Sequence, residues 1–312
     1  MAKTSIAAAA KEGRILVSDG AWGTFLFRKG LKQGECPELW CADHPDDVRD
    51  IAASYLASGA DMVETNSFGG TSTALARHGF AARAAELNES AARLSREALS
   101  RRGAKGSQAW VIGSMGPTGK MLVMGDVTPE EAFAAFGEQA EALARGGVDA
   151  LCIETMSEGE EAVIAVRAAK EAAGLEVICT FTFDRTAQGY YRTMMGLSPE
   201  NAAAAALDAG ADIIGTNCGN GFAGMIDVVR AMRPYARGLP IMVQANAGLP
   251  TNIDGVDAYP EGPEDMAALV PKLLDAGANI VGGCCGTTPA HIAAIRKAVD
   301  EYMAARVPGA TG

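Results

Sequence analysis

Short runs of apolar and β-branched residues recur along this chain, separated by intervals long enough for a helix. Most of these runs are continuously apolar rather than alternating, which is typical of parallel strands buried on both faces. They stand at Arg14–Asp19, Asp61–Asn66, Trp110–Ser114, Ala150–Thr155, Val177–Phe183, Ile213–Cys218, Ile241–Asn246 and Asn279–Cys285. We therefore predict eight buried and mostly parallel strands.

The stretches between these runs are amphipathic, rich in alanine and of helical length, so each of them predicts a helix. They include Pro45–Ser58, Ala81–Ser100, Pro129–Gly146, Glu158–Ala173, Pro199–Ala209, Phe222–Tyr235 and Pro263–Ala276. A glycine stands two residues before an Asp or Asn at the end of four of these stretches, at Gly59, Gly147, Gly210 and Gly277. Glycine favours the left-handed conformation that ends a helix, so each phrase predicts a helix-to-strand turn.

Eight strands that alternate with helices predict a (β/α)8 TIM barrel, an α/β fold. An open doubly wound sheet is the alternative, but it usually has fewer strands and a Gly-x-Gly-x-x-Gly signature after the first. The first strand is followed instead by Asp-Gly-Ala-Trp-Gly-Thr at 19–24. No linker or low-complexity run divides the chain. We predict a single domain over residues 1–312, with an N-terminal helical extension at 1–13 and a flexible tail at 303–312.

The composition narrows the possible functions. The chain has 312 residues and a formal net charge of −11, which argues against nucleic acid or another polyanion as a partner. The N-terminal segment is too short and too weakly apolar for a signal peptide or a membrane span. Seven cysteines, an odd number, fit a reducing compartment. We therefore expect a cytoplasmic protein without a membrane partner.

Three cysteines stand where two of the predicted strands end. Cys218 lies in Thr-Asn-Cys-Gly, and Cys284 and Cys285 lie in Gly-Gly-Cys-Cys-Gly. The glycines beside the pair indicate close backbone approach rather than core packing, whereas Cys152 and Cys179 lie in apolar runs and are interpreted as core residues. Three thiolates can hold Zn²⁺ and leave its fourth position open, as in catalytic zinc sites. A substrate thiol bound there would become a nucleophilic thiolate.

Polar residues stand at the ends of other predicted strands. All strands of a TIM barrel end at one face, where its active site forms. A carboxylate such as Glu154 can bind a substrate ammonium, and backbone N–H groups at Gly20-Ala21 and Ser114-Met115 can hold a carboxylate. With a metal that takes a thiol, these groups would recognise an α-amino acid with a terminal thiol.

The remaining polar residues at this face have more than one interpretation. Asp19 is a candidate substrate contact and Glu64 is another carboxylate at the mouth, but carboxylates at strand ends also cap helices or hold loop amides. Asn217 and Asn246 end strands beside the cysteines and are candidate substrate contacts as well. We also hypothesise that the Asn246 amide oxygen is a weak fourth zinc ligand when no substrate is bound. The three histidines have no evident catalytic partner and are interpreted as structural.

Several phrases resemble the homocysteine S-methyltransferase family over about Arg14 to Tyr302. They are Asp-Gly-Ala-Trp-Gly-Thr at 19–24, Thr-Asn-Ser-Phe at 65–68, Gly-Pro-Thr-Gly at 116–119, Glu154-Thr155, Asn217-Cys218, Asn-Ala-Gly-Leu-Pro at 246–250 and Gly-Gly-Cys-Cys-Gly-Thr-Thr-Pro at 282–289. The last of these phrases is highly specific. The phrases at 116–119 and 246–250 are most similar to the homocysteine-binding module of cobalamin-dependent methionine synthase.

The resemblance implies a (β/α)8 barrel with zinc on the three strand-end cysteines and homocysteine bound as a zinc thiolate. It implies contacts to the amino-acid end of homocysteine from the Asp19-Gly20 loop, Ser114 and Glu154. The sulfur would then attack a methyl group in line and form methionine, with zinc lowering the thiol pKa and the barrel orienting the reactants.

The chain departs from the complete synthase because no folate barrel and no Asp-x-His-x-x-Gly cobalamin motif follow the predicted barrel. We expect a methylcorrinoid donor, either on a separate corrinoid protein or as free methylcobalamin. A small sulfonium or betaine donor, and a related thiol or selenol acceptor, are the alternatives. The segment at 188–196, with its Tyr and Met residues, is a candidate gate or docking loop, or a packed loop.

Two other classes of function are alternatives for a barrel with such a site. A zinc hydrolase would need histidine-rich ligands and a base beside the metal-bound water, and the three-cysteine set argues against it. A carrier that delivers a metal or a thiol without catalysis would not produce methionine steadily from an added donor.

Overall fold

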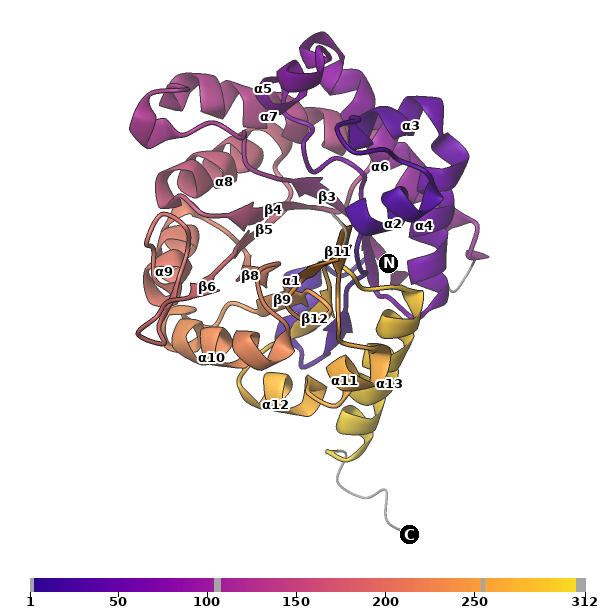
Figure 1. Ribbon diagram of the computed structural model, residues 1–312, viewed down its shortest axis with the longest axis vertical. Helices are drawn as coiled ribbons and strands as arrows, with labels where there is room; N and C mark the ends of the chain where they lie inside the picture. The colour runs from indigo at the N-terminus through magenta and orange to yellow at the C-terminus, as the bar shows by residue number, and fades with distance from the viewer. Residues whose placement is uncertain (1–2, 104–107, 254–255, 307–312) are drawn as a thin grey trace.

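The computed structural model describes residues 3–103, 108–253 and 256–306. Eight parallel strands curl into a nearly closed barrel, and helices surround it (Figure 1). In sheet order they are β1 (Leu16–Val17), β12 (Ile280–Gly283), β9 (Ile241–Ala245), β8 (Ile213–Asn217), β5 (Glu176–Phe181), β4 (Ala150–Met156), β3 (Trp110–Met115) and β2 (Met62–Glu64). Every one lies within or overlaps a predicted run, so the predicted (β/α)8 TIM barrel is confirmed.

The helices also follow the predicted stretches closely. They are α1 (Ile6–Lys11), α2 (Gly23–Lys29), α3 (Trp40–Asp43), α4 (Pro45–Ala57), α5 (Ser72–Leu75), α6 (Ala84–Ser100), α7 (Pro129–Gly146), α8 (Gly159–Ala173), α9 (Pro199–Ala209), α10 (Phe222–Met232), α11 (Pro263–Ala267), α12 (Val270–Asp275) and α13 (Pro289–Ala304). The predicted helix at 263–276 is divided in two, because Pro271 cannot donate a backbone N–H to the preceding turn. Residues 303 and 304 still belong to α13, and 307–312 lie outside the described residues.

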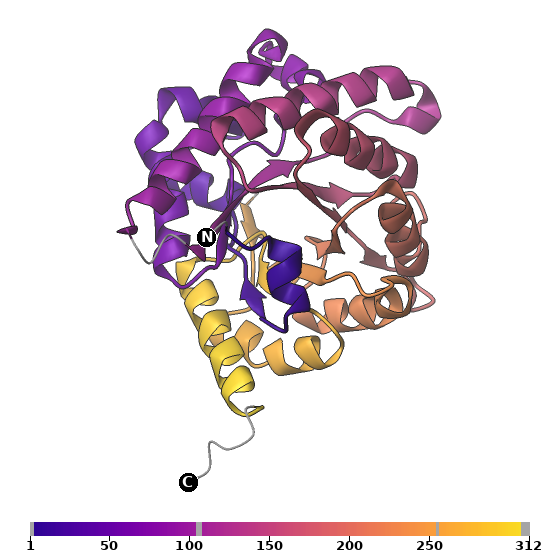
Figure 2. The ribbon, with the colours of Figure 1, turned by 180° about the vertical axis from the view of Figure 1, so that it is seen from behind.

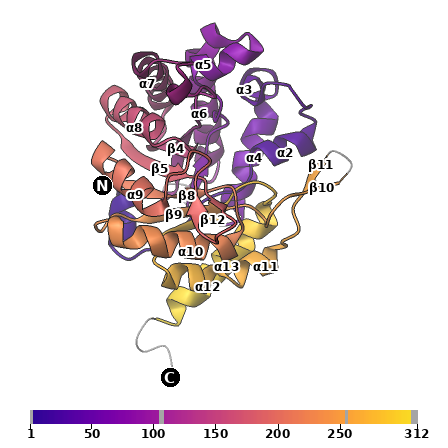
Figure 3. The ribbon, with the colours of Figure 1, turned by 60° about the vertical axis from the view of Figure 1, so that its left-hand side comes forward.

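Two short hairpins extend from the barrel at the ends of strands. The pair β10 (Thr251–Ile253) and β11 (Val256–Ala258) follows β9, and it projects away from the barrel in Figure 3. The pair β6 (Asp184–Arg185) and β7 (Tyr191–Arg192) follows β5. The second hairpin contains most of the predicted gate or docking loop.

The repeated helix-to-strand phrase ties neighbouring strands together at the bottom of the barrel. Gly59 and Gly147 have the predicted left-handed conformation, at φ of 96° in both. Two residues on, the Asp149 backbone N–H donates to the carbonyl of Val111 at 2.7 Å, and its carboxylate accepts the Val111 N–H at 2.8 Å. Asp61 makes the same two bonds to Val17 and so joins β2 to β1, where the barrel closes.

Replacing Asp149 with alanine is expected to lower the free energy of unfolding by about 2–3 kcal/mol, because the Val111 N–H loses a charged acceptor in a partly buried position. Urea denaturation would measure the loss. Asp227→Ala is the matched control, since among the described residues that carboxylate pairs only with exposed Arg230, and its loss should change stability by less than about 0.5 kcal/mol. Equal losses in both variants would contradict this role for Asp149.

The interior of the barrel changes from apolar to polar along the strands. Helix α1 closes the lower end (Figure 2) and packs against a layer of strand side chains. This layer consists of Leu16, Met62, Ile112, Cys152, Ile178, Ile213, Met242 and Ile280. Residues two further along a strand point to the same side, and here they are Ser18, Glu64, Ser114, Glu154, Thr180, Gly215, Gln244 and Gly282. The barrel core therefore ends in a polar floor just below the mouth.

Candidate active site at the carboxyl ends of the strands

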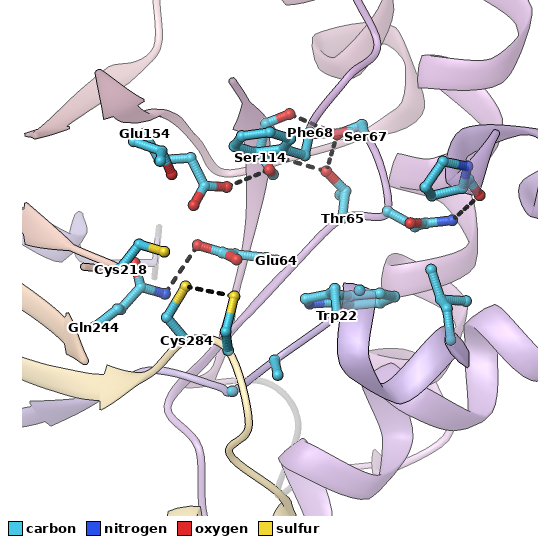
Figure 4. Close-up of a pocket in the computed structure, with 18 of the residues that line it drawn as sticks. Trp22, Glu64, Thr65, Ser67, Phe68, Ser114, Glu154, Cys218, Gln244 and Cys284 are labelled. Carbon is cyan, nitrogen blue, oxygen red and sulfur yellow. Dashed lines mark hydrogen bonds between the residues drawn. The ribbon is translucent and has the colours of Figure 1, made fainter. Parts of the chain in front are cut away.

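A cavity of about 250 Å³ opens above this polar floor. It lies among the loops that follow the strands, where a TIM barrel forms its active site (Figure 4). The lining residues include Gly20, Ala21, Trp22, Glu38, Glu64, Thr65, Phe68, Ser114, Glu154, Gln244 and the three strand-end cysteines. The structure thus gathers most of the predicted site residues around one cavity.

The three cysteines converge at one side of this cavity. The sulfur atoms of Cys218, Cys284 and Cys285 all lie within 4.8 Å of one another, with 4.0 Å between those of Cys284 and Cys285. Zinc held by about 2.3 Å bonds in a tetrahedron keeps its sulfur ligands about 3.8 Å apart. The spacing of the sulfur atoms therefore fits a zinc ion.

Strand β9, between β8 and β12, holds the backbone of the cysteine cluster in place. The Cys218 N–H donates to the carbonyl of Gln244 at 3.0 Å, and the Cys284 N–H donates to that of Ala245 at 2.7 Å. The Ala247 N–H donates to the carbonyl of Cys285 at 3.0 Å. Each cysteine is therefore bonded to the same strand or its end, which fixes the three sulfur atoms relative to one another.

The backbone beside the cysteines is tightly constrained. Cys218 has a φ of 59°, a conformation that residues other than glycine rarely adopt and that is common at functional sites. A Cβ atom on Gly283 would lie 2.3 Å from the hydroxyl oxygen of Thr287, so the chain needs glycine there. This confirms the prediction that the flanking glycines serve close backbone approach.

Hydrogen bonds link the thiols of the three strand-end cysteines. The pKa of Cys218 is lowered because the thiols of Cys284 and Cys285 donate hydrogen bonds to its sulfur, and Asn246 also bonds to it. The Asn246 Oδ1 atom is buried and has no hydrogen-bond partner among the described residues. A set of three sulfur atoms with an unpaired amide oxygen close by suits a soft metal ion such as zinc.

Glu154 lies in the cavity wall with both carboxylate oxygens held. The Ser114 hydroxyl donates to Oε1, and the Asn217 amide donates to Oε2 at 3.2 Å. Burial raises the pKa of Glu154 to about 7. Both donors occupy positions that leave the carboxylate facing the cavity, where it can bind a cation.

Asn217 holds its neighbours and does not line the cavity. Its Oδ1 accepts the Thr155 N–H and the Thr180 hydroxyl, both at 2.8 Å, while its amide donates to Glu154. Thr155 has the left-handed φ of 61° that this arrangement requires. The structure therefore places Asn217 as a support for Glu154.

Asp19 lies behind the cavity wall and is fully buried. Its carboxylate accepts the Trp22 indole N–H at 2.9 Å and the Glu64 N–H at 2.8 Å, and burial raises its pKa to about 6. It therefore shapes the first loop of the mouth. The predicted backbone donors are only partly available, because the Ala21 N–H donates to Thr287 and the Ser114 N–H to Thr65, each at 3.0 Å.

Two features of the site were not recognised in the sequence. Gln244 on β9 lines the cavity, and its amide donates to the Glu64 carboxylate at 2.9 Å. Phe68 covers the cavity from the β2 loop, because its ring packs on Gly116 at a point where a Cβ atom would be 2.6 Å away. Gln244 stands two residues after Met242 on β9, just as Glu64 stands two residues after Met62 on β2, so both side chains belong to the same layer of the barrel interior. An alignment of the strands by layer would have indicated Gln244 as a site residue.

The histidines fit their structural interpretation. His291 is buried, its Nδ1 accepts the Thr288 N–H at 3.2 Å, and its Nε2 lies 3.0 Å from the carbonyl of Glu261. His44 stacks on Trp40 with 4.2 Å between ring centroids. None of the three histidines lines the cavity. The β6–β7 hairpin and the residues after it are also outside its wall, with Tyr190 65% exposed and Met194 77% exposed.

The fold and this site define a TIM-barrel enzyme with a candidate three-cysteine metal centre. Residues 16–299 match the profile of the family described as homocysteine S-methyltransferase, and the chain belongs to this family. The methionine synthase of Mycobacterium tuberculosis is 34% identical over 299 residues, which are 92% of this chain and 25% of that protein. The methionine synthase of Mycobacterium leprae is 33% identical, covering 95% of this chain and 25% of its own length. The chain thus spans about a quarter of these relatives.

A solved structure shows the same fold. The metallated form of the homocysteine methyltransferase MmuM from Escherichia coli superposes with a TM-score of 0.75 at 24% identity, covering 93% of this chain and 98% of that one. Among the described residues, no helix combines the length and the apolar character needed to cross a membrane.

Proposed function

We propose that this protein is a zinc-dependent S-methyltransferase that converts homocysteine to methionine. The observation that carries the proposal is one cavity that is lined by both the three-cysteine cluster and the Glu154 carboxylate. A thiol and an ammonium on the same small molecule would reach both. The family to which the chain belongs supports homocysteine as that molecule.

Cys218, Cys284 and Cys285 would hold the zinc ion. When bound, zinc would lower the pKa of the substrate thiol, so that the sulfur is a nucleophile at neutral pH. The Asn246 oxygen would be a weak fourth ligand before substrate binds. Its unpaired Oδ1 supports this, because an amide can turn to exchange its oxygen and nitrogen at little steric cost.

The remaining residues would bind and orient homocysteine. Glu154, held by Ser114 and Asn217, would accept hydrogen bonds from its ammonium. Gly20 lines the cavity, and its N–H would donate to the substrate carboxylate. Fixing both ends of the amino acid leaves the sulfur aligned toward the open mouth, where a methyl donor can approach in line.

We infer that the donor is a methylcorrinoid, supplied by a separate corrinoid protein or as free methylcobalamin. The likeness to two mycobacterial proteins named methionine synthase supports this, together with the resemblance of the phrases at 116–119 and 246–250 to the homocysteine-binding module of cobalamin-dependent methionine synthase. A small sulfonium or betaine donor is the second candidate.

A donor screen tests the proposal. Zinc-loaded protein would be mixed with homocysteine and, separately, methylcobalamin, S-methylmethionine, S-adenosylmethionine, betaine or methylfolate, with methionine as the readout. We expect turnover with methylcobalamin. Turnover only with a sulfonium or with betaine would replace the corrinoid donor but keep the reaction. Tight homocysteine binding without methionine from any of these donors would exclude free methylcobalamin and leave a donor bound to a separate protein, and no binding would refute the substrate.

A further inference from the structure

The floor of the cavity contains a second polar group beside Glu154. Gln244 is 2% exposed and Glu64 is 6% exposed, and both line the cavity. The Gln244 Nε2 donates to the Glu64 carboxylate at 2.9 Å and to the Ser18 hydroxyl oxygen at 3.3 Å. Figure 4 shows Glu64 between Glu154 and Cys284, with Gln244 reaching it from below. The pair therefore lies under the middle of a molecule that spans the cavity.

The oxygen of Gln244 lacks a hydrogen-bond donor. Oε1 is buried and has no partner among the described residues. The amide has its nitrogen toward Glu64, an orientation that suits an ionised Glu64 carboxylate. A buried carbonyl oxygen without a partner is costly, so this acceptor indicates a donor that arrives with a ligand.

The charge around the cavity indicates what kind of donor this is. Glu38, Glu64 and Glu154 line the cavity, and none of the described lining residues is Lys, Arg or His. Burial raises the pKa of Glu64 well above its ordinary value, and the nearby Glu154 and Asp19 carboxylates add to this effect. A cation between these groups would relieve the repulsion. The missing donor is therefore expected to carry a positive charge.

We propose that Gln244 and Glu64 complete the ammonium-binding site of the substrate, together with Glu154. A primary ammonium has three N–H donors, and the three side chains offer one acceptor to each. The site would therefore select a free α-amino group over a methylated or absent one. This inference rests on the proposed function, since the sulfur of homocysteine must first be placed at the cysteine cluster.

The contact between Gln244 and the substrate ammonium is tested by removing the amino group from the ligand and, separately, the amide from the protein. Titration calorimetry on the zinc-loaded protein would compare homocysteine with 4-sulfanylbutanoate, which keeps the thiol and the carboxylate but lacks the amino group. The variant is Gln244→Met, similar in size and without the amide. We expect it to bind homocysteine about 10- to 100-fold more weakly and 4-sulfanylbutanoate within about 2-fold of wild type, because a lost bond to a charged group affects only the ligand that has the charge.

Three further measurements make the result decisive. Glu64→Gln, a second variant that keeps a polar partner for Gln244, should change the ratio of the two affinities in the same direction. Gln139→Met is the matched control, because Gln139 is a buried glutamine with an unpaired Oε1 outside the cavity, and it should leave the ratio unchanged. N,N-dimethylhomocysteine, with one N–H, should bind wild type at least about 10-fold more weakly than homocysteine.

The outcomes separate this inference from the proposed function. If Gln244→Met and Glu64→Gln weaken both ligands equally, the two residues only support the barrel and the inference is overturned. If wild type binds homocysteine and the amino-less thiol with equal affinity, the ammonium site does not exist. If wild type binds neither thiol, the proposed function itself fails.

Discussion

Replacing Cys285 with serine is expected to remove most of the bound zinc and all methyl transfer. A serine hydroxyl rarely ionises at neutral pH and is a much poorer zinc ligand than a thiolate. The loss in zinc affinity should exceed the roughly 10- to 100-fold that follows removal of an outer-shell partner. Zinc content by elemental analysis and methionine formation would both be measured on the purified variant.

Cys36→Ser is the control for this experiment. Cys36 is buried outside the cluster, and its thiol donates to Glu38 at 3.3 Å, a bond that a serine hydroxyl can also make. It should keep its zinc and its activity. Full turnover by metal-free Cys285→Ser protein would refute the zinc mechanism.

A separate variant tests the proposed fourth ligand. An unchanged zinc X-ray absorption spectrum in substrate-free Asn246→Ala would exclude Asn246 as the fourth ligand.

The fold could be predicted from the sequence because its signals are local. A strand buried on both faces, such as Ile241–Ala245, is continuously apolar, and a glycine such as Gly147 marks the end of a helix. The convergence of Cys218 with Cys284 and Cys285 also followed from the fold, since parallel strands of a barrel end at one face. These inferences need only the order of elements along the chain.

The contacts within the site could not be predicted in the same way, because they depend on the register between strands. Asp19 and Glu154 are both carboxylates at strand ends, yet Asp19 is bonded to Trp22 and Glu64 behind the wall, whereas Glu154 lines the cavity. The Ala21 N–H was expected to face the substrate, but Thr287, far along the chain, reaches it first. Side-chain pairs of this kind become visible only when the barrel is closed.

Replacing Glu154 with glutamine should be almost as damaging to methyl transfer as the loss of a cysteine. Glu154→Gln removes the negative charge that would bind the ammonium, and its amide would meet the hydroxyl of Ser114 and the amide of Asn217, both of which donate to Glu154. We expect kcat/KM for homocysteine to fall about 100- to 1000-fold, since a charged hydrogen bond is lost and buried donors lose their acceptor. Zinc content should stay the same, which distinguishes this variant from Cys285→Ser.

The pH dependence separates a substrate-binding role of Glu154 from a structural one. Burial raises its pKa to about 7, so in the free protein the carboxyl group becomes protonated as the pH falls through about 7. Because only the ionised form attracts an ammonium, kcat/KM in wild type should decline on this acid side, and the decline should be absent in Glu154→Gln. Glu161→Gln is the control, because this buried carboxylate holds Thr118 outside the cavity, and its acid limb should match wild type. An acid limb that persists unchanged in Glu154→Gln would assign the titration to another group, such as Asp19, and would remove Glu154 from ammonium binding.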